Sequence, residues 1–258
     1  MHSANHITNS GIEFKTAGPA PELSDFVESF WMLENPSDTA HETIGLPDGR
    51  FDIIFSYSPQ EPFHATQMGL GTEPGQHPIP PRIVMFAVSF KLLAIEYLLD
   101  VKAGSLLNTA HPLPAGFWGI AKDDLDDFEH FCEKISAKML SLVKPDIDER
   151  KKQLFELIYS SNGSLPVKEL SEKVFWSSRQ INRYFNEHFG ISLKAYCNIL
   201  RFKTSLHDIK GGNLFPNLDF ADQTHFIKEV KKFSGVAPRE LFKNQNDRFI
   251  LLSALPKK

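Results

Sequence analysis

Apolar positions in the first half of the chain follow both strand-like and helical patterns. The run Phe51–Tyr57 comes after the turn residues Pro47, Asp48 and Gly49 and is rich in residues that favour strands. Residues 83–90 form a second apolar run of strand length, whereas 92–99 and 123–143 carry apolar residues at helical spacing. The pattern predicts a mixed N-terminal half built on a β core.

From residue 146 onward, helical spacing dominates. Residues 147–160 predict one amphipathic helix, ended by Asn162 and Gly163. A short amphipathic helix over 167–174 then precedes another over 178–189, for which Ser177 or Ser178 is the expected N-cap. Helix, brief turn and helix in this order predict a helix-turn-helix unit.

The helix over 178–189 separates apolar from polar side chains. At about 100° per residue, Ile181, Tyr184, Phe185 and His188 share the side that we expect to be buried. Arginine can donate two hydrogen bonds to guanine and asparagine can pair with adenine, so these types on the opposite side suit reading of the major groove. That stripe consists of Arg179, Asn182, Arg183 and Asn186. A plain helical bundle with a solvated polar face is the alternative interpretation.

An internal repeat favours the DNA-binding interpretation. Residues 180–196 recur 45 positions later as 225–241, with a glycine ending each helix, and a connecting helix is expected between the copies. In the second copy lysines dominate the exposed stripe, and ammonium groups neutralise phosphates without fixed bidentate geometry. We therefore expect the first helix to read bases and the second mainly to grip phosphates through Thr224, Lys228, Lys231 and Lys232.

Charge divides the chain in the same place. Residues 1–145 hold nine Lys and Arg against 19 Asp and Glu, a net charge of −10, whereas 146–258 hold 19 against 13, a net charge of +6. A basic domain beside an acidic one is typical of nucleic-acid binding attached to a second module. We expect two domains, 1–145 for sensing or dimerisation and 146–258 for DNA binding, each with its own core.

Residues 147–245 resemble the DNA-binding domain of the AraC/XylS transcription regulators. The resemblance is carried by 177–185, by 189–196 and above all by 220–238, where an aromatic residue, Asp-Gln, His-Phe, a basic helix and Gly-x-x-Pro follow one another. It implies two helix-turn-helix units joined by a linker helix, with Ser178–Phe189 and Gln223–Phe233 as recognition helices. These helices add Ser178, Gln180, Gln223 and His225 to the expected DNA contacts.

Upstream, four segments resemble an uncharacterised, sensor-like N-terminal domain found on some members of that family: Phe30-Trp31, 46–49, 86–90 and 117–119. The chain also departs from the family. Residues 211–219, with two glycines and Pro216, stand where the first helix of the second unit belongs, and a regular helix is not expected there. Asp219 stands at a turn position where the family usually has glycine, and Phe175 occupies the corresponding position of the first unit. The sequence therefore leaves the turn conformation undetermined in both units.

The N-terminal domain is expected to sense a small-molecule effector or to form a dimer contact. Candidate pocket residues are Trp31, Asp48, Arg50 and Trp118, although the tryptophans fit a core and Asp48 fits a simple turn equally well. Acidic residues within 123–127 suit a helix N-terminus better than a metal site. No metal or other cofactor is expected.

Enzyme motifs are absent from the first half, with no Gly-rich phosphate loop, G-x-S-x-G or H-E-x-x-H. A DNA-repair methyltransferase on the same DNA-binding fold is the enzymatic alternative, but it needs reactive and zinc-binding cysteines, and Cys132 and Cys197 stand alone as expected buried thiols. With neither a secretory signal nor a membrane span, the chain is expected in the cytoplasm.

The sequence thus predicts a non-enzymatic, sequence-specific DNA-binding transcription regulator. Its expected partners are double-stranded DNA, a small-molecule effector, a second copy of the chain and, for an activator, RNA polymerase, but no membrane. A helical interaction protein without DNA affinity remains the second alternative.

Overall fold

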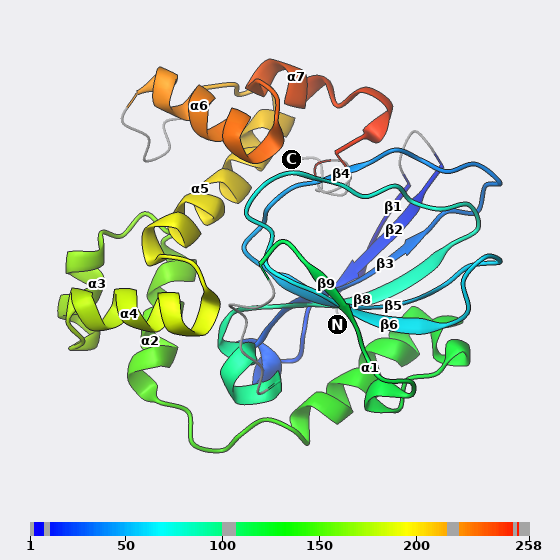
Figure 1. Cartoon of the computed structure of the whole chain (residues 1–258), viewed down its shortest axis with the longest axis horizontal. Helices are drawn as coiled ribbons and strands as arrows, with labels where there is room; N and C mark the ends of the chain where they lie inside the picture. Colours follow the sequence, from blue (N-terminus) through cyan, green and yellow to red (C-terminus); the bar gives the residue numbers. More distant parts are fainter. Residues whose placement is uncertain (1–2, 8–10, 100–106, 216–221, 250–251, 253–258) are drawn as a thin grey trace.

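Strands come first along the chain and helices second in a computed structural model that describes residues 3–7, 11–99, 107–215, 222–249 and 252 (Figure 1). This is the α+β architecture that the sequence predicts. Side chains along each strand point alternately to the two faces of the sheet, whereas each helix buries one face. This agrees with the strand-like and helical spacing of apolar residues in the sequence.

Seven antiparallel strands form one sheet in the described part of the first half. In spatial order they are β1 (Ser3–Ile7), β2 (Glu13–Ala17), β3 (Val27–Glu34), β8 (Val84–Phe90), β5 (Phe51–Tyr57), β6 (His64–Met68) and β9 (Ala110–Pro112). A separate ribbon pairs β4 (Ile44–Gly45) with β7 (Gly75–Gln76). The strands predicted over 51–57 and 83–90 are confirmed as β5 and β8.

The two faces of this sheet differ in what covers them. Phenylalanines of β3, β5 and β8 point to one face, which α1 (Phe128–Leu140) covers (Figure 1). The Phe131 ring lies 5.7 Å from that of Phe55 and 5.4 Å from that of Phe86, both edge to face. The other face carries Trp31, Asp52 and their neighbours, which line a cavity.

The helix predicted over 123–143 begins later than the pattern suggested. Asp127 is extended, with φ −137° and ψ 114°, and its carboxylate accepts hydrogen bonds from the N–H groups of Glu129 and His130. It therefore caps α1 and separates it from the short turn η5 (Lys122–Leu125). The helical pattern over 92–99 is met by a short helix over 93–99, whose last five residues form the wider π-helix η2 (Ile95–Leu99).

Helices make up the second half. They are α2 (Glu149–Ser160), α3 (Val167–Val174), α4 (Ser178–Phe189), α5 (Leu193–Lys210), α6 (Gln223–Ser234) and α7 (Pro238–Lys243). In Figure 1, α5 runs diagonally between α2, α3 and α4 at one end and α6 and α7 at the other. Short turns η1 (Pro21–Leu23), η4 (Phe117–Gly119) and η6 (Gln245–Asp247) complete the described elements.

The hydrophobic core is continuous between the two halves, whereas we expected a separate core in each. Buried residues of the sheet, α1, α2, α4 and α5 form one cluster. Tyr196 on α5 is one link, since it packs on Phe185 at 5.8 Å and its hydroxyl donates to the Gly49 carbonyl of the β domain. The helices are therefore seated on the sheet domain through a packed interface.

Candidate DNA-binding surface and ligand cavity

The first unit consists of α3, the turn 175–177 and α4. Ser177 is its cap residue: Ser177 Oγ accepts the Gln180 N–H at 3.3 Å, and Gln180 Oε1 accepts the Ser177 N–H at 3.0 Å. This reciprocal pair satisfies two backbone donors that a helix N-terminus otherwise leaves unpaired. Gln180, expected at DNA through its side chain, thus has its carbonyl oxygen occupied by the cap.

Phe175 forms the turn in an unusual way. Its backbone is left-handed, with φ 53° and ψ 38°, and its side chain is 90% exposed. A residue with a Cβ pays about 1–2 kcal/mol for this conformation. The next residue, Trp176, is half-buried and packs 5.3 Å from the ring of Tyr184, which fixes the turn against α4.

The apolar side of α4 is buried. The rings and aliphatic side chains that were expected there lie inside the protein, with His188 half-buried against Tyr184 at 4.7 Å. The buried residues are Ile181, Tyr184, Phe185 and Phe189. The helix therefore has one fixed orientation, and its opposite side is the side available to a partner.

That opposite side is the first stripe, formed by Arg179, Asn182, Arg183 and Asn186. Both arginines and Asn186 are exposed, while Asn182 is half-buried. The two asparagines donate into their own helix, Asn182 to the Ser178 carbonyl at 2.9 Å and Asn186 to the Asn182 carbonyl at 2.8 Å. Arg183 Nε lies 3.9 Å from Glu187 Oε1, a loose surface pair. The arginine side chains are thus accessible to a partner. Each asparagine would have to give up its hydrogen bond to a backbone carbonyl of α4 before it could bond to a base.

The described helix of the second unit is α6, and α7 follows it along the chain. Asp222 caps α6 by accepting the His225 N–H at 2.8 Å, and Phe226, Val230 and Phe233 are buried. Its second stripe is fully exposed and contains Gln223, Thr224, His225, Lys228, Lys231 and Lys232. Residues 211–215 form turns and bends instead of a helix, as expected, whereas 216–219, including Asp219, lie outside the described residues.

Helix α5 sets the distance between the two units. It has 18 residues and so spans roughly 27 Å at 1.5 Å per residue. Its start packs on α4, and near its end Phe202 packs on Phe233 of α6 with ring centroids 5.3 Å apart.

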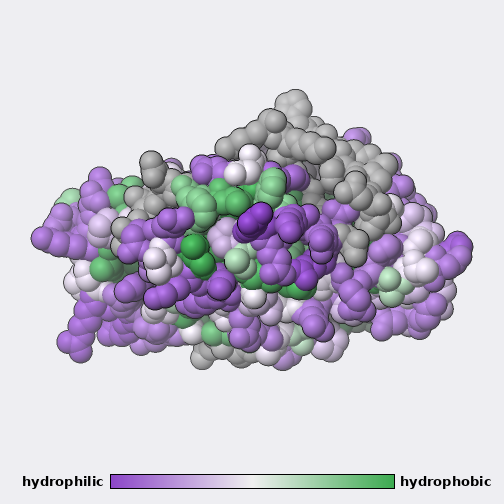
Figure 2. Space-filling view, turned by 90° about the horizontal axis from the view of Figure 1, so that it is seen from above, coloured by the Kyte–Doolittle hydropathy of each residue, from purple (hydrophilic) through white to green (hydrophobic). Residues whose placement is uncertain are grey.

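Figure 2 views the molecular surface from the side of α6 and α7. It shows a hydrophobic area in the middle of the visible face, with hydrophilic residues around it.

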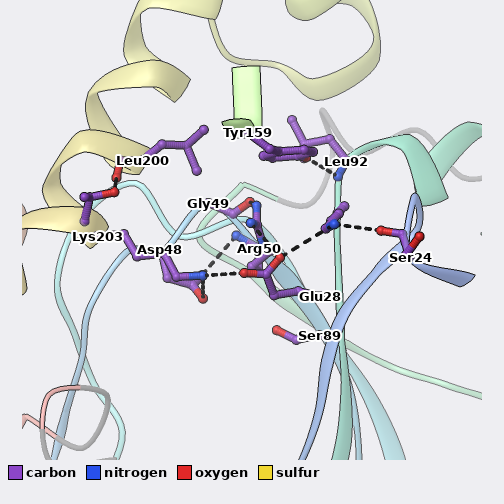
Figure 3. A network of polar contacts seen from close by, with 12 residues as sticks. Ser24, Glu28, Asp48, Gly49, Arg50, Ser89, Leu92, Tyr159, Leu200 and Lys203 are labelled. Atoms are coloured by element: carbon purple, nitrogen blue, oxygen red, sulfur yellow. Dashed lines mark hydrogen bonds and ion pairs between the residues drawn. The ribbon is translucent and has the colours of Figure 1, made fainter. Parts of the chain in front are cut away.

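A buried polar network joins the β domain to the helices (Figure 3). Arg50 is at its centre: the guanidinium donates to Glu28 Oε2 at 3.0 Å and to the Tyr196 hydroxyl at 3.2 Å, and it lies 4.7 Å from the Tyr159 ring centroid. Lys203 of α5 also approaches Glu28, at 3.3 Å. Helices α2 and α5 thus contact the sheet domain through a network with Arg50 at its centre.

Charge at this network is balanced within the protein. Burial alone would raise the pKa of Glu28, but the charges of Arg50, Lys203 and Lys91 outweigh it and lower the pKa to about 2. Arg50 is buried, yet its partners raise its pKa, so it stays charged. The network is therefore an ionised pair that joins the domains at neutral pH.

A second contact joins the base of α4 to the β domain. The Tyr184 hydroxyl donates to Glu96 Oε2 at 3.0 Å, and Lys151 of α2 pairs with the other oxygen of Glu96. Helix α4 of the first unit therefore contacts the β domain directly, and the adjoining helices α2 and α5 contact it through the Arg50 network. Neither Glu28 nor Glu96 had a sequence signal, because their partners lie more than 20 residues away along the chain.

The sheet face opposite α1 holds a cavity of about 450 Å³, between the strands and the loop residues around β4 and β7. Trp31, Asp48 and Arg50, three of the four candidate pocket residues, line it together. Trp118 is not among the lining residues, because its ring stacks on Phe117 at 4.8 Å and packs against Phe90. The cavity also contains a residue that the sequence analysis missed, Asp52, whose signal was a lone charge within an apolar strand.

Asp52 is the titratable group with the most altered environment in this cavity. Burial and the charge of Asp48 raise the pKa of Asp52 to about 7, against opposing hydrogen bonds from Ser89 and Trp31 and the charge of Lys203. Ser89 Oγ donates to Asp52 Oδ1 at 2.5 Å. The carboxylate is thus held in place at the cavity wall.

The two cysteines are buried and unbonded, as expected. Burial raises the pKa of Cys132 to about 12 and that of Cys197 to about 11, so neither is an activated thiolate. Within the described ranges, no three His, Cys, Asp or Glu side chains lie together in a way that could hold a metal ion. The same residues include no helix long and apolar enough to cross a membrane.

One family model matches part of the first half of the chain. Residues 15–112 match a domain of unknown function (DUF6597). This range contains three of the four N-terminal segments on which the sensor-like resemblance rests, but not 117–119. No curated protein matches the chain.

Among solved structures, the chain is similar to ToxT from Vibrio cholerae. One such structure has 12% identity and a TM-score of 0.42 over 83% of this chain and 97% of ToxT. ToxT bound to (E)-4-(8-methylnaphthalen-1-yl)but-3-enoic acid has 12% identity and a TM-score of 0.43 over 86% and 97%. ToxT bound to an unsaturated fatty acid has 12% identity and a TM-score of 0.41 over 82% and 93%. Similarity at this level establishes no shared function.

Proposed function

We propose that this chain is a sequence-specific DNA-binding transcription regulator of the AraC/XylS type. The observation that carries the proposal is the first stripe: two exposed arginines and two asparagines on α4, whose opposite side is buried. Fixed orientation matters because base reading requires side chains held at a defined register in the major groove. Helix α5 connects α4 to a second helix, α6, which carries exposed lysines.

The two stripes support a division of labour. Arg179 and Arg183 suit bidentate pairing with guanine, whereas Lys228, Lys231 and Lys232 suit phosphates, which bear no sequence information. In this proposal α4 reads bases and α6 mainly grips the backbone. Gln180 contributes through its cap, which orders the N-terminus of α4, rather than through base contact.

The β domain is proposed to regulate DNA binding through an effector. Its cavity and its buried contacts to α2, α4 and α5 support this role, because a change at the cavity wall would be transmitted to the first unit. We further propose that the protein acts in the cytoplasm, without enzymatic activity or cofactor. A second copy of the chain and, for an activator, RNA polymerase remain expected partners.

Selection from random DNA, followed by titrations at several salt concentrations, tests the proposal. Arg183→Ala should reduce the discrimination between bases at one position of the site by about 1–3 kcal/mol in binding free energy. The base preference at the other positions should not change. Lys228→Ala should weaken binding to all sequences alike and reduce the salt slope by about 1. Lys122→Ala removes an exposed lysine of η5 in the other domain and is the matched control, with no effect expected.

Two results would contradict the proposal. If the full chain showed no salt-dependent DNA binding, the proposal of a DNA-binding regulator would be wrong, and the alternative of a helical interaction protein would be favoured. If Lys228→Ala altered base preference and Arg183→Ala weakened all sequences equally, DNA binding would stand but the assignment of the two helices would be reversed.

A further inference from the structure

The cavity on the sheet face opposite α1 has apolar and charged lining residues, the charged ones being Asp48, Arg50, Asp52 and Glu73. Because side chains alternate along strands, Trp31 of β3, Ile54 of β5 and Met85 of β8 point into it together, and Asp52 lies two residues from Ile54 on the same side. Loop residues around β4 and β7, including His77, form its rim. At about 450 Å³ it has the size of a small-molecule site.

Positive charge near this cavity is engaged elsewhere. Arg50 lines the cavity, but its guanidinium donates to Glu28, the Gly49 carbonyl and Tyr196. Asp48 pairs with Lys203, whose Nζ lies 3.7 Å from Asp48 Oδ2. Asp48 and Arg50 thus each have a counter-charge within the protein, Lys203 for the first and Glu28 for the second.

Asp52 differs in this respect. It receives a hydroxyl hydrogen bond from Ser89, but no Lys or Arg among the described residues lies within 4.0 Å of its carboxylate. The Trp31 side chain lines the same cavity, from the strand on the other side of β8. Burial, together with the charge of Asp48, raises the pKa of Asp52. A carboxylate without an ion-pair partner, together with an aromatic ring and apolar side chains such as Ile54 and Met85, is the surrounding that a cation with an apolar body requires.

We infer that this cavity binds an organic cation, a protonated amine or a guanidinium on an apolar body, with its charge placed against Asp52 and Trp31. An anionic ligand would meet Asp48, Asp52 and Glu73 without a free positive partner in the wall. The ligand class rests on the cavity alone. Its role as the effector rests on the proposed function.

The wall of the cavity also provides the connection to the helices (Figure 3). Gly49 lies between Asp48 and Arg50, and a Cβ added to it would come within 2.8 Å of Leu200 on α5. The loop 48–50 therefore fits closely against α5, which holds both units. A cation that draws Asp48 toward the cavity would act on the Lys203 contact and on the Arg50 contacts at the same time.

Calorimetric titration of the full chain at pH 7.5 tests this with three probes of similar shape: 2-phenylethylammonium, neutral 3-phenylpropanol and anionic 3-phenylpropanoate. We expect the ammonium to bind with a Kd of about 1 mM or tighter and the other two at least tenfold more weakly. Asp52→Asn should remove this preference. Asp38→Asn, which alters an exposed aspartate paired with Arg82 far from the cavity, should keep it.

Trp31→Leu is the second variant, so that the test does not depend on the folding of Asp52→Asn. It should weaken the ammonium more than the neutral alcohol. The inference is overturned if none of the probes binds, if the propanoate binds as tightly as the ammonium, or if Asp52→Asn retains the preference. A DNA shift assay on the same preparations separates the two proposals. If the chain binds DNA but none of the cations, only the cation site is refuted. If it binds the cation but not DNA, only the proposed DNA-binding function is refuted.

Discussion

The two helical units share a sequence pattern but differ in how they are held. The first unit is tied to the β domain by side chains, through Tyr184 with Glu96 and through Arg50 with Tyr196 on the adjoining helix. The second unit is packed on α5 by apolar contacts such as Phe202 with Phe233. Its described link to the β domain follows α7, where the Arg248 carbonyl accepts the Ile44 N–H at 2.6 Å.

This difference indicates where a signal from the β domain would arrive. Ionised and hydrogen-bonded contacts respond to a small displacement, because their strength depends on distance and angle. Apolar packing of the second unit responds less. The helix proposed to read bases is therefore also the helix that the β domain positions, whereas the helix proposed to grip phosphates is set mainly by α5.

The largest effect is expected from removing the arginine that ties the first unit down. Arg50→Met removes the closest partner of Glu28 and a hydrogen bond to Tyr196, but Glu28 is one-third exposed and keeps Lys203, so we expect a cost of about 1.5–3 kcal/mol in the free energy of unfolding. Urea denaturation measures the loss, and hydrogen exchange should show it in α2 and α5 more than in α6. Arg82→Met removes an exposed pair with Asp38 and should cause no measurable loss. Equal deprotection of α6 would contradict the comparison.

Acid should release the same connection. The folded-state pKa of Glu28 is about 2, below the usual 4.5, so its ionisation stabilises the folded state above pH 4.5. This contribution, about 2 kcal/mol after allowance for its exposed third, is lost as the pH falls from 4.5 toward 2. Glu28→Gln should flatten the dependence of unfolding free energy on pH in that window. An unchanged slope would show that Glu28 is not ionised in this contact.

The caps allow a matched test of the two units. Ser177→Ala on α4 and Asp222→Ala on α6 each remove a side-chain acceptor from a helix N-terminus, at about 1 kcal/mol. Because only Ser177 has a reciprocal partner in Gln180, its loss should be the greater of the two. Thermal unfolding of both variants decides this, and a greater loss from Asp222→Ala would reverse the ranking.

The smallest effect is a gain. Phe175→Gly relieves a left-handed backbone at an exposed position and should stabilise the protein by about 0.5–1 kcal/mol, after the greater chain entropy of glycine is deducted. Phe242→Gly is the matched control, since Phe242 is exposed on the helix α7 and glycine there should destabilise. Destabilisation by both would mean that the Phe175 ring itself contributes to stability.

Much of the helical half could be predicted from the sequence, because helical periodicity is a local property. The buried side of α4, its start at a serine cap and the turn region after Lys210 all followed from residue spacing. The start of α1 could not be placed, because several acidic residues were equally suited to cap it and only the backbone of Asp127 selected one. The cavity was predicted only in part, since Asp52 and Trp31 meet through strand pairing across β8.

By itself, the sequence determined the order of strands and helices, the faces of α4 and α6, and the residue types that each face exposes. These depend on spacing within a single element. The tertiary structure alone decided that the core is continuous, that Arg50 joins the two halves, that Gln180 is a cap and that Asp52 lacks a counter-charge. Such features depend on which distant residues become neighbours, and burial and charge pairing act only once the chain has brought them together.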